Sequence, residues 1–465
     1  MQKAHLTCIV LLFSTLYLYL VDVGVVGDVK HETSYKSLVR SSSTYGVFNG
    51  YIPMFAAWNG RRYPGNLHVF VKAGTMDSSV AVRGFVFFEL IDGPLVSHDH
   101  GMHQLSLPNM FRNLSMKVVH RRSDLRTPIH ISYVPTNGNF STKNQHAGIP
   151  GFFQFSLPLG PVDYRIRVDD ATRVIELDYI LLSAKKYQVE RHNQWITVIH
   201  PLEMYPVPLK MQVELAVTHI LHHLRVGASG TMWYVRRHQI IHIKENASVQ
   251  RLVHEGKLHL ISWDIFSQPE SEGSGFDSVF VNYHAALSYW RENTWLMFID
   301  IDEFLALPRP ASAMSNPMHE YMNMRPCWSL LRRTVFHQDS KTGLDSKYTT
   351  VFDTENWRRL RALHNASGLG SAVWQLTLQI ADRFPKPFLN PDRAIFGFVH
   401  EAWELPDQKH LDPGRPMSRD ASQLHRCSTL NDTHAYLAHN VNAFALRVPP
   451  SEGSIENKEW LWPYH

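Results

Sequence analysis

Cysteine is scarce in this 465-residue chain, and its charges nearly cancel. Three cysteines are too few for a disulfide-rich scaffold or a cysteine-based zinc module. Cys8 lies in the N-terminal apolar segment, so Cys327 and Cys427 are the one pair that could form a bridge in the folded part, and the sequence leaves open whether they do. Forty-six basic and 42 acidic residues give a net charge of +4 with histidine neutral, which is too small to indicate nucleic-acid binding.

Several catalytic motifs are absent as well. The chain has no glycine-rich phosphate loop, no G-x-S-x-G elbow and no H-E-x-x-H zinc motif, which argues against the enzyme classes built on them. Hydrophobic residues nevertheless make up 44% of the chain, which is enough for a large packed core, and the length allows two or three domains. We therefore expect a folded, multidomain protein.

Long apolar runs are also rare, and the one near the N-terminus predicts entry into the secretory pathway. Residues 6–21 are mostly apolar, follow Lys3 and His5, and end at Asp22. About 20 apolar residues span a bilayer, so this run is short but close, and residues 1–27 fit either a cleaved signal peptide or an uncleaved signal anchor. Five N-x-S/T sequons agree with this route, at Asn113, Asn139, Asn246, Asn365 and Asn431.

Residues 51–188 have the pattern of a β-sandwich-like N-terminal domain. Short runs rich in Val, Ile, Phe and Tyr recur, several alternate between apolar and polar residues, and turns with Gly, Pro or Asn separate many of them. We expect strands at 67–74, 84–91, 114–120, 129–134, 164–170 and 173–182. The polar residues 28–50 before this domain are interpreted as a stem or linker.

The pattern changes beyond residue 188, where strands alternate with helices. The helix expected at 210–224 places Val213, Val217, Ile220, Leu221 and Leu224 on one face. Such alternation is typical of an α/β fold with a mostly parallel sheet and helices on both faces, which we predict for 189–465. The other expected elements are strands at 195–200, 231–235, 258–263 and 294–302, and helices around 247–255 and at 276–293.

The stretch WLMFIDIDEFLALP, from Trp295 to Pro308, ends an apolar run with closely spaced carboxylates. Residues 295–299 have the composition of a central parallel strand, and ligands of such sheets bind beyond the carboxyl ends of the strands. Asp300 and Asp302 fall there, and side chains two apart in an extended segment share a face. Carboxylates suit Mg²⁺ or Mn²⁺, which commonly bridge to a substrate diphosphate. Taken alone, the D-x-D sequence is equally consistent with a strand cap that forms salt bridges at a solvated turn.

The motif W-x-x-F-I-D-I-D-E-F-L resembles the signature of glycosyltransferase family 92. The resemblance covers about 190–405, and its other parts come in the family's order: WITVIHPLEMY, LRVGASGTMWYV, GKLHLISW and RFPKPFLNPDRAIFGFVH. It implies a GT-A fold, Mn²⁺ or another divalent cation, and inverting transfer of a sugar, galactose in characterised members, from a nucleotide sugar to a glycan. It also implies a single-pass type II Golgi membrane protein with a luminal catalytic domain, or a secreted one if the N-terminal segment is cleaved.

The chain departs from the family pattern in two places. The helix before the aspartates reads VNYHAAL, without the cysteine that family members often have, and the Phe-Gly-rich stretch expected after them is matched at best by TVFHQDS at 334–340. Plant members with this layout carry an N-terminal β-sandwich, and the β-rich domain at 51–188 could be an equivalent, carbohydrate-binding domain, although no motif in it shows this.

The resemblance also implies roles for individual residues around a donor such as UDP-galactose. Asp302 would bind the metal directly, while Asp300 would contact the metal-bound water or the donor ribose, and His400 would add a metal ligand. Lys386 would offset the charge that grows on the leaving diphosphate, with Arg393 as a second candidate.

Inverting transfer also needs a base that takes the proton of the acceptor hydroxyl. Glu401 is the first candidate, because it follows the expected metal ligand, and Glu404 and Asp339 are alternatives. Trp403 could stack on a sugar ring or belong to the core. Glu303 could orient a ligand or form a surface salt bridge.

Two other classes of function compete with a transferase. The first is a non-catalytic glycan-binding protein, in which the sandwich is attached to a decayed transferase domain. The second is a hydrolase with paired carboxylates, but retaining glycosidases need two free carboxyls about 5 Å apart, and a D-x-D at a strand end fits that requirement poorly.

Overall fold

The computed structural model of the protein describes secondary structure between residues 39 and 440. Within the described residues no helix is both long and apolar enough to cross a membrane. The N-terminal apolar segment, most of the proposed stem, His400 and Asp339 lie outside the described residues. The described ranges are 39–40, 46–58, 61–75, 79–90, 115–120, 126–131, 151–158, 164–168, 174–176, 185–186, 194–202, 209–263, 276–307, 317–337, 376–398, 401–405, 425–430 and 435–440.

Two sheets form the part of the fold before residue 190. The six-stranded sheet has the order β1-β2-β3-β4-β7, with β10 beside β3, and the four-stranded sheet has the order β6-β5-β8-β9. Their inward side chains, among them Val69, Val82, Val118 and Ile166, share one hydrophobic cluster. The strands are β1 (Val39–Arg40), β2 (Phe48–Trp58), β3 (Arg61–Thr75), β4 (Ser79–Leu90), β5 (Met116–His120), β6 (Arg126–Ile129), β7 (Gly151–Pro158), β8 (Tyr164–Val168), β9 (Val174–Glu176) and β10 (Lys185–Lys186).

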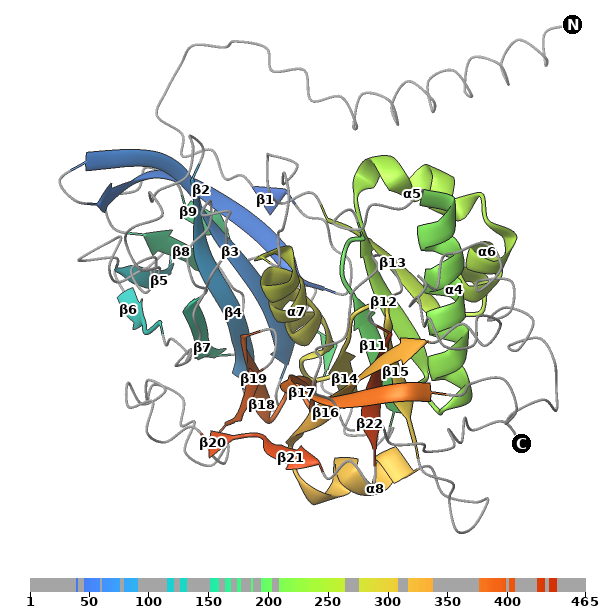
Figure 1. Cartoon of the computed structure of the whole chain (residues 1–465). Helices are drawn as coiled ribbons and strands as arrows, with labels where there is room; N and C mark the ends of the chain where they lie inside the picture. The colour runs from blue at the N-terminus through green and yellow to red at the C-terminus, as the bar shows by residue number, and fades with distance from the viewer. Residues whose placement is uncertain are drawn as a thin grey trace, which may run out of the picture. The chain divides into compact units, whose positions relative to one another are not determined.

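A nine-stranded sheet follows, with the order β13-β12-β11-β14-β17-β16-β22-β15 and β21 beside β16 (Figure 1). Its strands are β11 (Gln194–Ile199), β12 (Gly230–Val235), β13 (Leu258–Ser262), β14 (Thr294–Phe298), β15 (Glu303–Ala306), β16 (Cys327–His337), β17 (Leu376–Leu389), β21 (Ser428–Leu430) and β22 (Tyr436–Asn440). A separate three-stranded sheet joins β18 (Ala394–Phe398), β19 (Glu401–Glu404) and β20 (His425–Arg426).

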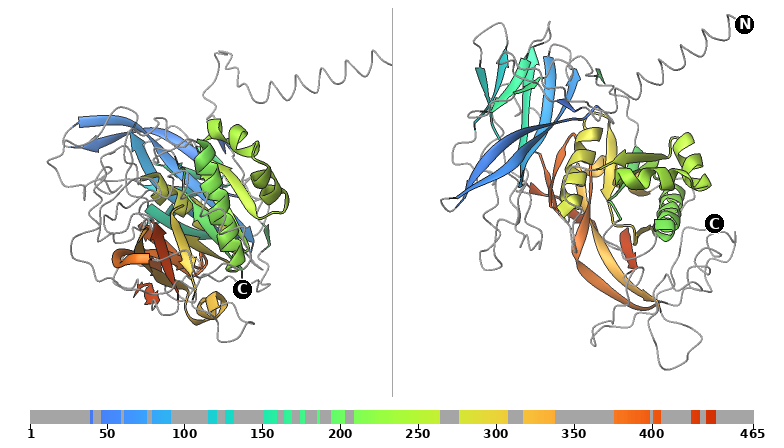
Figure 2. Two further views of the ribbon diagram at one scale, coloured as in Figure 1. Left: turned by 45° about the vertical axis from the view of Figure 1, so that its right-hand side comes forward. Right: turned by 90° about the horizontal axis from the view of Figure 1, so that it is seen from above.

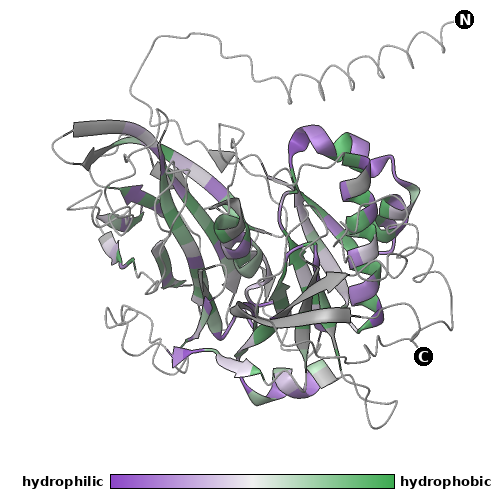
Figure 3. Ribbon diagram, viewed as in Figure 1, coloured by the Kyte–Doolittle hydropathy of each residue, from purple (hydrophilic) through white to green (hydrophobic). Residues whose placement is uncertain are grey.

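Five helices lie among the described residues: α4 (Leu209–Arg225), α5 (Arg237–Lys244), α6 (Ala247–His254), α7 (Phe276–Tyr289) and α8 (Pro317–Met324). Alternate residues of the parallel strands face different helices. Trp233 and Val235 share a cluster with α4, α5 and α6, whereas Met232 and Tyr234 share one with α7. Figure 2 shows these helices in two further views, and Figure 3 shows bands of hydrophobic and hydrophilic residues along α4 and α6. This period-2 alternation places α7 and the group α4–α6 on opposite faces.

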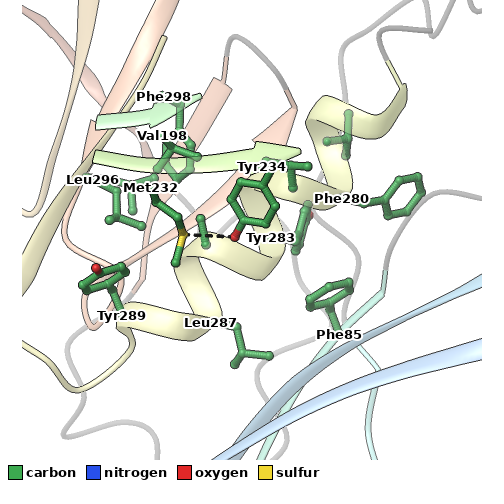
Figure 4. Packing of buried hydrophobic residues seen from close by; sticks show 14 of the residues in the cluster. Phe85, Val198, Met232, Tyr234, Phe280, Tyr283, Leu287, Tyr289, Leu296 and Phe298 are labelled. Carbon is green, nitrogen blue, oxygen red and sulfur yellow. Dashed lines mark hydrogen bonds between the residues drawn. The ribbon is translucent and has the colours of Figure 1, made fainter. Parts of the chain in front are cut away.

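Helix α7 is buried on nearly all sides. Its cluster includes Phe87 of β4. The same cluster includes Leu296 and Phe298 of β14 and Phe85 of β4, which are labelled in Figure 4. The rings of Phe87 and Phe280 lie 4.1 Å apart between centroids. The buried apolar residues of α7 thus pack on strands from both parts of the chain, although the helix also buries the polar side chains of Asn282, His284 and Ser288.

The fold class predicted from the sequence, a mostly parallel α/β sheet of the GT-A type, is wrong. Strands predominate over helices, and most strand pairings among the described residues are antiparallel. Among the described strands, parallel order is limited to β13-β12-β11-β14, where strands alternate with helices as expected, and to the contacts of β16 with β21 and β22 and of β10 with β3.

The long antiparallel strands β16 and β17 are the main source of this error. They pair over most of their length and join β14 to the rest of the sheet. Strand β17 contains Pro385 and Pro387, although it lies between two partners. Proline cannot donate to a sheet ladder and normally argues against an interior strand, so the sequence here does not indicate one.

A disulfide joins Cys327, at the start of β16, to Cys427, just before β21, across 100 residues of sequence. We expect the double variant Cys327→Ser, Cys427→Ser to lose about 2–4 kcal/mol of unfolding free energy, because the unfolded chain gains the freedom of a long loop. Denaturant titration of both proteins measures this loss. Mass spectrometry of alkylated, unreduced protein should find neither cysteine labelled, and labelling of both would contradict the bridge.

Candidate functional site

The candidate site begins at the carboxyl ends of two adjacent parallel strands. Because Val198 of β11 pairs in register with Phe298 of β14, His200 and Asp300 emerge at the same edge of the sheet. His200 Nδ1 lies 3.5 Å from Asp300 Oδ1, and its Nε2 lies 2.7 Å from Oδ1 of Asn282 on α7. The imidazole is thus held between a buried amide and the first aspartate of the D-x-D sequence.

Asp300 forms a close ion pair with Lys386, which strand β17 brings in from 86 residues further along the chain. The ammonium donates to Asp300 Oδ2 at 2.6 Å, and the lysine side chain is 1% exposed while that of Asp300 is 28% exposed. Burial by itself would raise the pKa of Asp300, but the positive charge of Lys386 and the bond with His200 hold that pKa well below its usual range. Burial would lower the pKa of Lys386, but Asp300 and Glu303 raise it.

Glu303 links this pair to a second cation. Its side chain is fully buried, and its Oε1 accepts from Arg332 Nη1 at 3.0 Å and lies 3.6 Å from Lys386 Nζ. Its Oε2 accepts from the backbone N–H of Asp300 at 2.8 Å. Two carboxylates and two cations therefore balance each other, which offsets much of the cost of burying each charge. Of the two roles considered for Glu303, a surface salt bridge is excluded by this burial.

The two aspartates lie on a turn and not on the extended segment that the sequence suggested. The Glu303 N–H donates to the Asp300 carbonyl at 3.0 Å, and the Asp300 N–H donates to the Glu303 side chain, so two reciprocal bonds close the turn over residues 300–303. Strand β14 ends at Phe298, and Asp302 is a buried residue of the turn. The turn, not strand alternation, therefore determines where the two carboxylates point.

The described residues contain no group of three or more His, Cys, Asp or Glu side chains that could hold a metal ion. The two carboxylates of the turn suit a hard cation, but Lys386 already engages Asp300 Oδ2, so a cation would have to share Asp300 with the ammonium. The residues fit a divalent ion only in part, and His400 lies outside the described residues.

The other predicted site residues that the structure describes lie on or beside the three-stranded sheet. Glu401 accepts a hydrogen bond from Arg426 Nη2 at 2.7 Å, and Arg426 also lies over the Trp403 ring at 5.3 Å. Trp403 is buried in a small apolar cluster, as its core alternative required. Arg393 is exposed in the turn before β18, and Glu404 lies 3.7 Å from Arg325.

The structure thus brings together Asp300, Glu303 and Lys386, and it adds two partners that the sequence reading did not name, His200 and Arg332. His200 could have been found, because it follows an expected strand that neighbours the D-x-D strand in a parallel sheet. Arg332 carries no such signal, since only the pairing of β16 with β17 and β22 places it at the site.

No known family model matches this chain, and no curated protein has significant similarity to it.

Proposed function

We propose that the protein is a metal-dependent inverting glycosyltransferase, which moves a sugar such as galactose from a nucleotide-diphospho-sugar to a glycan acceptor. The observation that carries the proposal is the buried network of Asp300, Glu303, Lys386 and Arg332 at the carboxyl ends of parallel strands. Charged groups with shifted pKa values, here the lowered pKa of Asp300 and the raised pKa of Lys386, are typical of functional sites when they lie beyond the carboxyl ends of parallel strands. The motif similarity to glycosyltransferase family 92 supports the same activity.

In this proposal Asp302 and Asp300 of the acidic turn would hold the cation, and His400 would be a further ligand. A bound divalent cation supplies positive charge against the leaving nucleotide diphosphate. Lys386 contributes through Asp300, because its buried ammonium contacts that carboxylate directly. Glu401 is the proposed base, and Arg393 contributes to binding of the donor.

The test is an assay of the purified protein with Mn²⁺, a panel of nucleotide sugars including UDP-galactose, and glycan acceptors. We expect acceptor-dependent release of nucleoside diphosphate, its loss in a chelator, and its return with added Mn²⁺. Release that is unaffected by the chelator would refute the metal, and no release from any donor would refute the transferase.

A second candidate is a glycan-binding protein without catalytic activity. The observation in its favour is that Lys386 already occupies Asp300 Oδ2, so the carboxylate is paired within the protein. Glycan binding without nucleotide release from any donor would support this candidate.

We also propose that the protein enters the secretory pathway as a single-pass Golgi membrane protein, or as a secreted protein if residues 1–27 are cleaved. The Asn246 sequon allows a sharp test, because Asn246 is also the N-cap of α6. Its Oδ1 accepts from the N–H groups of Ser248 and Val249 at 3.0 and 3.2 Å, and a glycan would attach through the other amide atom, Nδ2.

We expect wild-type protein from secretory cells to carry an endoglycosidase-sensitive glycan at Asn246. Ser248→Ala and Asn246→Asp should both lose the glycan and keep the cap, whereas Asn246→Ala should also lose about 1 kcal/mol of unfolding free energy relative to Asn246→Asp. Gel mobility and denaturant titration measure the two effects. A cytosolic product with an unmodified Asn246 would contradict the proposed route.

A further inference from the structure

Strand β15, which begins at Glu303, is an edge strand of the nine-stranded sheet. It pairs with β22 on one side, and helix α4 lies against its other side. Edge strands carry a row of backbone groups that need partners, and a buried edge must satisfy them. Here the partners are three histidine side chains of α4.

The three histidines are His219, His222 and His223, spaced so that they share one face of α4. His219 Nε2 donates to the carbonyl of Glu303 and His222 Nε2 donates to that of Leu305, both at 2.9 Å. His223 Nε2 accepts from the Leu305 N–H at 3.2 Å. The ring nitrogens thus satisfy the hydrogen-bonding capacity of consecutive outward-facing backbone groups of β15, the Glu303 carbonyl and the N–H and carbonyl of Leu305.

The bonding pattern also assigns the protons. A carbonyl only accepts, so His219 and His222 carry hydrogen on Nε2, whereas His223 accepts at Nε2 and donates from Nδ1 to the His219 carbonyl at 2.8 Å. Burial lowers the pKa of His219 to about 3 and that of His223 well below its usual range, which keeps these rings neutral in a mildly acidic lumen.

Glu303 receives this contact on its carbonyl while its side chain binds the Asp300 N–H, Arg332 and Lys386. The α4 histidines therefore hold the backbone from which the charged network starts. A shift of β15 away from α4 would move the Glu303 carboxylate and, through it, the turn that carries both aspartates.

We propose that His219, assisted by His222 and His223, is a positioning residue that fixes the acidic turn, and with it the Asp300 and Asp302 carboxylates that would hold the divalent cation. This inference rests on the proposed function for the identity of the cation. It assigns the histidines no contact with substrate or metal, because all three act through the backbone of β15.

The primary experiment is a titration of the full chain with Mn²⁺ alone, in which the electron paramagnetic resonance signal of free Mn²⁺ gives the dissociation constant. We expect His219→Leu to weaken Mn²⁺ binding ~10-fold or more, the range typical when a residue that orients metal ligands is lost. His219→Gln, which can donate from a similar position, should recover most of the affinity.

His284→Leu is the matched control. His284 is also buried, its pKa is also lowered to about 3 by burial, and its Nδ1 lies 2.7 Å from the Tyr234 hydroxyl on the α7 side of the sheet. Its replacement should destabilise the fold without changing Mn²⁺ affinity. A purely structural role for His219 would make the two leucine variants alike.

Three results would overturn the proposal: equal Mn²⁺ affinity of His219→Leu and wild type, no recovery in His219→Gln, or no Mn²⁺ binding by wild type. Should His219→Leu fail to fold, the comparison of His219→Gln with His223→Gln decides the matter. His223→Gln keeps a side chain that can accept a hydrogen bond from the Leu305 N–H. Both glutamine variants should therefore bind Mn²⁺ within ~3-fold of wild type. A ~10-fold loss of affinity in both variants would overturn the proposal. Absence of nucleotide release with Mn²⁺ binding intact would refute only the transferase.

Discussion

Asp302→Asn should lower turnover by ~100-fold or more while the protein stays folded. The substitution removes the charge that we assign to direct metal binding but keeps the size of the side chain in the turn. A metal contributes several kcal/mol of charge stabilisation in the transition state, and each ~1.4 kcal/mol corresponds to a tenfold change in rate. The measurement is kcat at saturating Mn²⁺ and donor, together with a thermal unfolding midpoint.

Asp392→Asn provides the control for loss of a buried carboxylate. Asp392 accepts from the backbone N–H of Arg291, and burial raises its pKa, so it has a structural role away from the acidic turn. This variant should keep its turnover even if its unfolding midpoint falls. Equal turnover of Asp302→Asn and wild type would remove Asp302 from the metal site.

Glu303→Gln should cost about 3–5 kcal/mol of unfolding free energy, the range found when one member of a buried ion pair is removed. The variant keeps the shape of the side chain but removes the buried negative charge that Arg332 and Lys386 both contact. Denaturant titration at neutral pH measures the loss. A change below about 1 kcal/mol would show that the buried charge of Glu303 is not needed.

The partly exposed pair of Glu401 and Arg426 is the matched control, because it joins the same two chemical groups at 2.7 Å nearer to solvent. Exposed ion pairs contribute about 0–1 kcal/mol, so Glu401→Gln should change stability little. A double variant, Glu303→Gln with Arg332→Met, should be more stable than Glu303→Gln alone, since it also removes the buried positive charge that the Glu303 carboxylate balanced.

The network changes the role of Lys386 from the one that the motif suggested. The sequence reading placed its ammonium on the leaving diphosphate, but the structure buries it against Asp300 and Glu303. A lysine of this kind neutralises and orients carboxylates. Lys386 then affects a bound cation through Asp300, which Lys386→Met should reveal as a change in Mn²⁺ affinity.

The local sequence pattern predicted helices and strands well where each element buries one face with a regular period. The expected helix at 210–224 matches α4, and the strands expected at 195–200 and 258–263 match β11 and β13 within a residue or two. These elements follow the 3.6-residue or two-residue period of a buried face. The strand expected at 294–302 was too long, because its last residues form the turn closed by Glu303.

The sequence by itself determined the secretory expectation, the parallel start of the large sheet and the acidic stretch at its edge. These follow from composition and short-range periodicity, which need no knowledge of distant residues. Only the tertiary structure decided that β16 and β17 make the sheet largely antiparallel, that Arg332 and Lys386 neutralise the carboxylates, and that α4 holds β15 through its histidines. Such contacts join residues that lie 29 to 86 positions apart, and burial makes each charge depend on partners that no local pattern specifies.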